Sequence, residues 1–222
     1  MGLIVYGAAL SPFVRKVRVF LAEKGLDYTL ENVNIFPMPD WFKELSPLKR
    51  IPVLKDEEAG LVLADSSAIC GYLEKLKPAP ALYPQGATDF GRALWFEEYG
   101  DSEMAAAIGM GTFLPIVVSQ LMGQAPDVAT AEKTIADKLP IFFSYLNQEI
   151  GSKSFLVGDA FSIADISVAT GFVNFGHAGF KPDAATYPDL VRYLADIHAR
   201  PSFAACIAQE TAVLDKLLKR TA

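Results

Sequence analysis

Ser11 opens the stretch "SPFVRKVR", in which a serine precedes a proline where the pattern predicts the start of a helix. Three cations follow closely, Arg15, Lys16 and Arg18, although the N-terminal end of a helix already carries partial positive charge. An anion at this end would explain the arrangement, because the helix N-terminus and a serine hydroxyl both stabilise negative charge. The stretch therefore indicates that Ser11 faces an anionic group, with a simple N-cap as the alternative.

Two later groups carry further chemistry. Pro52 stands in "KRIPVL" at the predicted start of a strand, a position where proline is tolerated. Asp65 and Ser66 stand in "LADSSAI" at a strand-to-helix junction, so the Ser66 hydroxyl and the helix-terminal N–H groups face whatever lies beyond the strand. A third group is structural: "FSIADI" predicts a capping box with Ser162 as N-cap and Asp165 at N3.

The elements that position these groups divide the chain near residue 80. Strand and helix signals alternate before it, in the order βαβ and then ββα, and every strong pattern after it is helical. The stretch "PAPALYPQGAT" is rich in proline, glycine and alanine and indicates a linker. The sequence therefore predicts an α/β domain over 1–78, a linker over 79–87 and an all-helical domain over 88–222.

Composition narrows the class of protein. The chain has 222 residues, is 51% hydrophobic and 21% charged, and carries a net charge of −6, which favours a folded globular protein and disfavours nucleic-acid binding. The uncharged segment Met104–Pro126 is long enough to span a membrane, but its glycines and Pro115 favour a buried helix bent near that proline. No secretory signal is visible. Cys70 and Cys206 are expected to be buried core residues rather than a disulfide. We therefore expect a cytoplasmic protein without a membrane partner.

The order and spacing of these motifs resemble those of the cytosolic glutathione transferases of the serine type. The motifs are SPF at the first helix, IPV before a strand, an acidic-serine pair, and an S-x-x-D cap in a helical domain. The resemblance covers nearly the whole chain. It implies a thioredoxin-like first domain, a homodimer, a role in detoxification, glutathione as co-substrate, an apolar electrophile as second substrate, and no metal.

Ser11 is then the expected donor to the glutathione thiolate. A thiol with a pKa of ~8.5 needs a drop of roughly two units to be mostly ionised at neutral pH. A hydroxyl donating to a charged group contributes ~1.5–3 kcal/mol and a helix N-terminus ~0.3–1 kcal/mol. Arg15 and Arg18 would add a favourable field if turned toward the site, with a solvated helix face as the alternative. Tyr6 is the rival donor and is predicted to lie in the core.

The residue type at position 11 also indicates which reaction the protein catalyses. Glutaredoxins and thiol-transferring relatives have a cysteine before the Pro-Phe or Pro-Tyr, and that cysteine forms a mixed disulfide with glutathione. Ser11 cannot form one, so attack by glutathione itself is favoured. The branch of the family that isomerises maleylacetoacetate usually shows Ser-Ser-Cys here, and "ALSPF" lacks it.

The resemblance also implies how glutathione is held. Its cysteinyl backbone would pair with Ile51, exposed by a cis bond to Pro52. Asp65 and Ser66 would hold the γ-glutamyl end. Lys49 stands where the family usually has a glycine with positive φ, so a rebuilt loop is expected there. Further glutathione contacts are assigned to Phe13 and Arg50, and the second-substrate pocket to Met104, Ile108 and Phe113.

Two alternatives remain open from the sequence. A non-catalytic member of the same fold would bind glutathione or a partner protein without turnover. The residues of the second-substrate pocket form a Met and aromatic stripe, which is more often core than pocket. The dimer interface is expected to involve the helix "SSAICGYLEK" and the helix that holds Trp95–Asp101.

Overall fold

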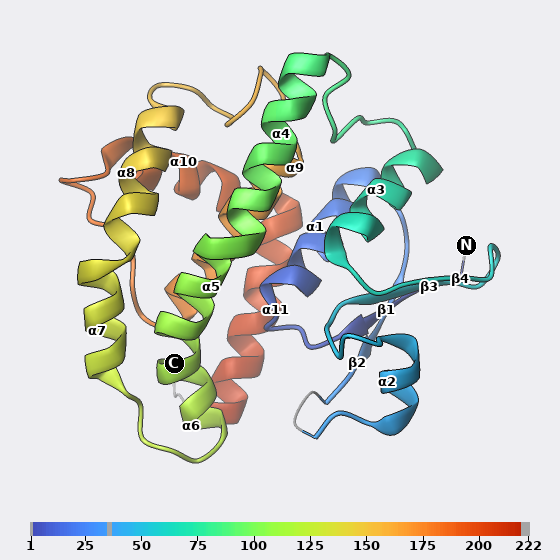
Figure 1. Ribbon diagram of the computed structural model, residues 1–222, viewed down its shortest axis with the longest axis horizontal. Helices are drawn as coiled ribbons and strands as arrows, with labels where there is room; N and C mark the ends of the chain where they lie inside the picture. The colour runs from blue at the N-terminus through green and yellow to red at the C-terminus, as the bar shows by residue number, and fades with distance from the viewer. Residues whose placement is uncertain (1, 35–36, 219–222) are drawn as a thin grey trace. The chain divides into compact units, whose positions relative to one another are not determined.

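The computed structural model describes residues 2–34 and 37–218 (Figure 1). The chain forms two compact units, Met1–Tyr83 and Pro84–Ala222. The first unit is a four-stranded sheet with helices and the second is helical. The fold class predicted from the sequence is therefore confirmed.

The sheet of the first unit has the strand order β2-β1-β3-β4. Strand β1 (Leu3–Gly7) is parallel to β2 (Thr29–Asn32) and antiparallel to β3 (Val53–Asp56), and β4 (Leu61–Leu63) pairs antiparallel with β3. Burial alternates along β1, as expected for a strand whose successive side chains point to opposite faces. As an inner strand, β1 directs its C-terminal end into the loop that leads to Ser11.

Helices α1 (Pro12–Lys24) and α3 (Ser66–Leu76) pack against each other, whereas α2 (Asp40–Leu45) lies apart from this pair (Figure 1). Gly7 at the end of β1 allows α1 to approach the sheet closely. A Cβ atom on Gly7 would lie only 2.5 Å from the Cγ2 atom of Val14. The absence of a side chain at Gly7 thus fixes the distance between the sheet and the first turn of α1.

The second unit is built around a buried central helix. Every residue of α9 from Ile163 to Phe175 is buried, and α9 packs against α4, η1, η2 and α10. A nearly continuous apolar surface on all sides of a helix is the pattern of a core helix. The helices of this unit are α4 (Ala87–Tyr99), η1 (Gly100–Met104), α5 (Ala105–Ile108), η2 (Gly109–Val118), α6 (Ser119–Leu121), α7 (Val128–Asp137), α8 (Leu139–Ile150), α9 (Ile163–His177), α10 (Pro188–His198) and α11 (Pro201–Leu218).

The segment predicted to be a buried helix bent near Pro115 contains the π-helical stretch η2, and a second π-helical stretch, η1, ends at its first residue, Met104. Pro115 lies inside η2, where its missing N–H interrupts the helical hydrogen bonds. The strongest departure from helical geometry is instead at Ser102, with φ −103° and ψ −106°. The sequence therefore predicted the irregular helix correctly but placed its main distortion about a dozen residues too late.

Burial in this helix is one-sided. Ile116 and Val117 are buried, whereas Met110 and Met122 are exposed. Within the described residues, one helix, spanning Ala87–Leu121, is long and apolar enough to cross a membrane, a test that the core helix of a folded domain also passes.

The predicted capping box at the start of α9 is confirmed. Ser162 is the N-cap, and its N–H donates to the Oδ2 atom of Asp165 at 2.9 Å. The Oδ1 atom of Asp165 accepts from the Leu156 N–H at 2.9 Å and from the Tyr193 hydroxyl at 2.8 Å. This fully buried carboxylate thus joins the loop before α9, the first turn of α9, and α10. The contacts with Leu156 and Tyr193 were not predicted.

Candidate active site

Ser11 is the N-cap of α1, with φ −73° and ψ 128°. Its Oγ accepts a hydrogen bond of 3.4 Å from the Val14 N–H, and its own N–H donates to the Ala8 carbonyl at 3.0 Å. A hydroxyl that accepts a cap bond still carries its own proton. The capping role and the donor role are therefore compatible at this residue.

The cations that follow Ser11 do not form a solvated helix face. Every residue of α1 from Val14 to Leu21 is buried, including Arg15 and Lys16, and Arg18 is 7% exposed. The Nε atom of Arg18 donates to the Tyr28 hydroxyl at 3.0 Å. The alternative of a solvated face was wrong, because hydrogen-bond partners inside the fold allow these long side chains to be buried.

Tyr6, the rival donor, lies in an aromatic cluster on β1 and α2. Its ring meets that of Trp41 edge-on at 5.8 Å between centroids and lies 6.5 Å from that of the fully buried Phe42. Val33 and Val53 complete the buried part of this cluster. Tyr6 itself is partly buried and packs against this cluster, so its assignment to the core stays a prediction.

The loop before β3 keeps the backbone conformation that a glycine would adopt. Lys49 has φ 55° and is the one non-glycine residue with positive φ among those the structure describes. The buried Ser46 closes the loop, because its Oγ accepts from the Arg50 N–H at 2.9 Å and donates to the Arg50 carbonyl at 2.7 Å. The expectation of a rebuilt loop was therefore wrong. The peptide bond between Ile51 and Pro52 is cis, as the resemblance implies.

Replacing Lys49 with glycine should stabilise the protein by about 0.5–1 kcal/mol. The left-handed conformation costs a residue with a side chain roughly 1–2 kcal/mol, and the greater freedom of glycine in the unfolded chain offsets roughly 0.4–1 kcal/mol of the gain. Urea midpoints of wild type, Lys49→Gly and Lys49→Ala would measure this. Lys49→Ala keeps the Cβ atom and should match wild type. A Lys49→Gly midpoint at or below wild type would contradict the explanation.

The N-terminal turn of α3 differs in one detail from the prediction. Asp65 is the N-cap, and its Oδ1 accepts from the N–H groups of Ser67 and Ala68, each at 3.0 Å. Ser66 is the first helical residue rather than the cap, and it is 7% exposed. The first N–H of a helix has no acceptor within the helix. The Ser66 N–H and hydroxyl therefore form a pair of donors suited to a carboxylate.

The residues predicted for the second-substrate pocket are buried in the helical unit. A Cβ atom on Gly171 of α9 would lie 3.5 Å from the Cε of Met104 and 3.6 Å from the Cδ1 of Ile108, so both side chains pack on α9 at this glycine. Phe113 is 8% exposed. These contacts are those of core residues, which was the alternative to a substrate pocket. A role of the three residues in substrate binding stays a prediction.

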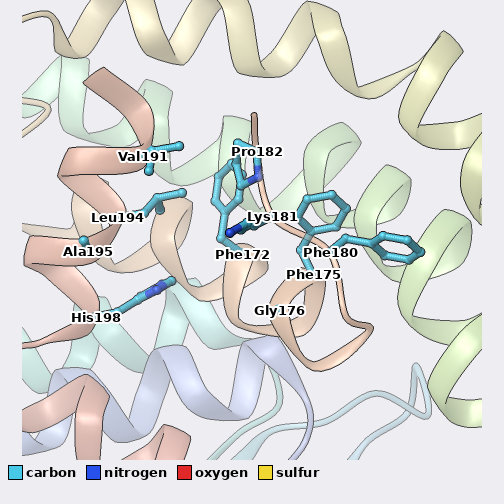
Figure 2. A pocket seen from close by; sticks show the side chains of 10 residues that line it. All are labelled: Phe172, Phe175, Gly176, Phe180, Lys181, Pro182, Val191, Leu194, Ala195 and His198. Carbon is cyan, nitrogen blue, oxygen red and sulfur yellow. The ribbon is translucent and has the colours of Figure 1, made fainter. Parts of the chain in front are cut away.

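The helical unit also contains a cleft of about 190 Å³ between α9, α10 and the loop that joins them. In Figure 2, the side chains of Leu194 and His198 extend from α10 toward the phenyl rings of α9. None of the predicted site residues lines this cleft. Among the described residues, no group of three or more His, Cys, Asp or Glu side chains is arranged to hold a metal ion. The cleft is lined by Phe172, Phe175, Gly176, Phe180, Lys181, Pro182, Val191, Leu194, Ala195 and His198.

An α/β unit with a serine at the first helix N-terminus, followed by a helical unit, defines a thioredoxin-like two-domain protein. Residues 10–76 match the N-terminal domain of glutathione S-transferase, and residues 113–210 match its C-terminal domain. Glutathione S-transferase 3 of Zea mays is 30% identical over 211 residues, which are 92% of this chain and 92% of that protein. The chain belongs to the glutathione S-transferase family.

Two further relatives fit this assignment. Maleylacetoacetate isomerase of Rattus norvegicus is 28% identical over 192 residues, which are 84% of this chain and 83% of that protein. The crystal structure of a glutathione S-transferase from Rhodospirillum rubrum F11 has a TM-score of 0.84 at 28% identity, covering 92% of this chain and 91% of that one.

Proposed function

We propose that this glutathione transferase ionises the thiol of glutathione at Ser11 and directs the thiolate at an apolar electrophile. The observation that carries the proposal is the position of the Ser11 hydroxyl at the N-terminus of α1. A hydrogen bond from this hydroxyl and the helix N-terminus together supply ~1.8–4 kcal/mol, against ~2.7 kcal/mol for a drop of roughly two pKa units. The upper part of this range covers the required drop in the pKa.

The reaction uses glutathione as the nucleophile. The thiol proton leaves to solvent, the sulfur lone pair forms a bond to the electrophilic carbon, and either a leaving group departs with its electron pair or an activated double bond accepts the electrons. Ser11 keeps its own proton and donates a hydrogen bond that is strongest when the sulfur is charged. Because Ser11 has no sulfur, it cannot form a mixed disulfide.

The tripeptide is proposed to lie along the first unit. Ile51 lies two residues before the start of β3 and outside the paired register of that strand, so its main chain suits pairing with the cysteinyl residue. The donors of Ser66 suit the γ-glutamyl carboxylate and Asp65 suits the amino group. Phe13 and Arg50 remain proposed contacts. The protein is proposed to act in the cytoplasm.

Two other functions are less well supported than general transferase chemistry: isomerisation of maleylacetoacetate, and binding of glutathione without turnover. A maleylacetoacetate isomerase is among the relatives, but this chain has "ALSPF" where that branch usually has Ser-Ser-Cys. A member that only binds glutathione is the weaker alternative, because the matching family models and the Zea mays relative are glutathione S-transferases. We therefore propose general transferase chemistry rather than isomerisation or binding alone.

The protein is proposed to be a homodimer, with an interface formed by α3 and by the end of α4. Trp95 is 52% exposed and Phe90 and Leu94 are also exposed on α4, and such apolar patches mark interaction sites. Asp101 is the candidate to reach the γ-glutamyl amine bound by the partner subunit. We expect twice the monomer mass at micromolar concentration by light scattering, and a monomer after Trp95→Glu. A monomeric wild type would contradict the proposed interface.

Binding to immobilised glutathione, followed by turnover with a general aryl halide, tests the proposed function. We expect retention on the resin, elution by free glutathione, and release of halide that depends on the enzyme. Tight binding without turnover of several electrophiles would favour the non-catalytic reading. Failure to bind glutathione would contradict both.

A further inference from the structure

We infer that Lys16 is a positioning residue for the γ-glutamyl end of glutathione: it holds the first turn of α3 and adds positive charge where the α-carboxylate binds. This inference rests on the proposed function. Lys16 belongs to α1 and is completely buried. Its Nζ donates a hydrogen bond of 2.9 Å to the Oγ of Ser67, the second residue of α3. The contact therefore ties the helix that begins after Ser11 to the helix that begins at Ser66.

Ser67 is held from two sides. Its side chain accepts the bond from Lys16, and its main-chain N–H donates to Asp65 Oδ1 at 3.0 Å. Ser66 lies in the chain between Asp65 and Ser67, which this hydrogen bond joins. The N–H and hydroxyl of Ser66 are the proposed donors to the carboxylate. Any displacement of Ser67 would move the Ser66 donors with it. Lys16 thus fixes a binding group that it does not itself need to contact.

The charge of Lys16 favours an anion at this turn. Lysine is almost never fully buried unless it serves as a partner, and buried charges are screened much less by salt than exposed ones. The hydrogen bond from an ammonium group to a hydroxyl is charge-assisted. The positive charge adds to the partial positive charge at the N-terminus of α3. The combination selects a ligand with an α-carboxylate, which in glutathione belongs to the γ-glutamyl residue.

A purely structural contact between α1 and α3 would explain the same geometry. The two roles differ in one measurable property, because a structural contact does not distinguish a ligand with the carboxylate from a ligand without it. A glutathione analogue in which 4-aminobutyrate replaces the γ-glutamyl residue lacks only this carboxylate. The ratio of its Kd to that of glutathione reports how strongly the protein recognises the carboxylate.

The experiment measures both Kd values by calorimetry for wild type, Lys16→Met and Lys55→Met. Lys55 is a partly exposed lysine of β3, paired with Glu57 at 3.0 Å, so its variant removes the same charge elsewhere in the unit. We expect the ratio to fall about 10-fold in Lys16→Met and to stay at the wild-type value in Lys55→Met. Ser67→Ala should lower the ratio in the same direction but by less than Lys16→Met, because it removes the contact and leaves the charge of Lys16 in place.

An unchanged ratio in Lys16→Met would overturn the inference and leave the proposed function intact. A wild type that binds neither ligand would instead refute the proposed function, and the inference with it. If circular dichroism shows that Lys16→Met is unfolded, Ser67→Ala decides, since it removes a single hydroxyl. An unchanged ratio in Ser67→Ala would then overturn the inference.

Discussion

Ser11→Ala lowers the turnover of glutathione conjugation by about 3- to 25-fold at neutral pH, while the Kd for glutathione changes little. The reason is that the hydrogen bond from the hydroxyl strengthens as charge develops on sulfur. Its loss removes ~1.5–3 kcal/mol of thiolate stabilisation, which raises the pKa of the bound thiol by roughly one to two units. Stopped-flow or steady-state kinetics with an aryl halide, together with calorimetric binding of glutathione, measure the two effects separately.

Tyr6→Phe is the matched control, because it removes one hydroxyl from the rival donor. Tyr6 packs in the aromatic cluster with Trp41 and Phe42. We expect its variant to keep turnover within a factor of about two of wild type, as the ring remains in place. A large loss in Tyr6→Phe with an unaffected Ser11→Ala would identify the tyrosine as the donor and Ser11 as a cap.

Asp165→Asn destabilises the protein by about 3 kcal/mol. Both carboxylate oxygens accept hydrogen bonds, from Leu156 and Tyr193 on one side and from Ser162 on the other. An amide presents an NH2 group to one of these sets of donors and leaves them without an acceptor in a buried site. Denaturant midpoints of the variant and wild type measure the loss. Coincident midpoints would show that the network contributes little.

Ser162→Ala is the milder companion variant. It removes the cap hydroxyl and leaves the Ser162 N–H bond to Asp165, so we expect a loss of about 0.5–2 kcal/mol. Glutathione affinity should be unaltered in both variants. A larger loss in Ser162→Ala than in Asp165→Asn would contradict the central place given to the carboxylate.

The effect of Asp165→Asn should also depend on pH. Burial raises the pKa of Asp165, and this outweighs the hydrogen bonds from Leu156, Tyr193 and Ser162, which act in the opposite direction. Between the ordinary and the raised value the folded state holds one more proton than the unfolded state, so the contribution of this group to stability falls as the pH rises. Asparagine does not titrate. The deficit of the variant should therefore become smaller as the pH rises from the ordinary pKa of an aspartate through the raised pKa of Asp165.

The sequence predicted those parts of the site that depend on local pattern. The Ser-Pro start of α1 and the capping box at Ser162 are both set by residues within one or two turns. The α/β and helical halves followed from periodicity in the same way. The cis bond before Pro52 came from the family resemblance rather than from the pattern.

The parts that were missed depend on contacts between distant segments. Lys16 and Ser67 are 51 residues apart, and no periodicity in the sequence shows that a cation will be buried against a serine. The clamp of Ser46 on Arg50 spans four residues, but its signal, a Ser-Pro turn before a basic pair, is common to many loops. Lys49 was expected to avoid the left-handed region by its own preference, and the closed loop overrides that preference.

The most direct test of the account is an ultraviolet difference titration of the thiolate of glutathione bound to the wild-type protein. We expect the bound thiol to ionise roughly two pKa units below its free value of ~8.5, and Ser11→Ala to move the midpoint up by roughly one to two units. A bound thiol that titrates near ~8.5 in wild type, with no difference in Ser11→Ala, would contradict the claim that this site activates glutathione.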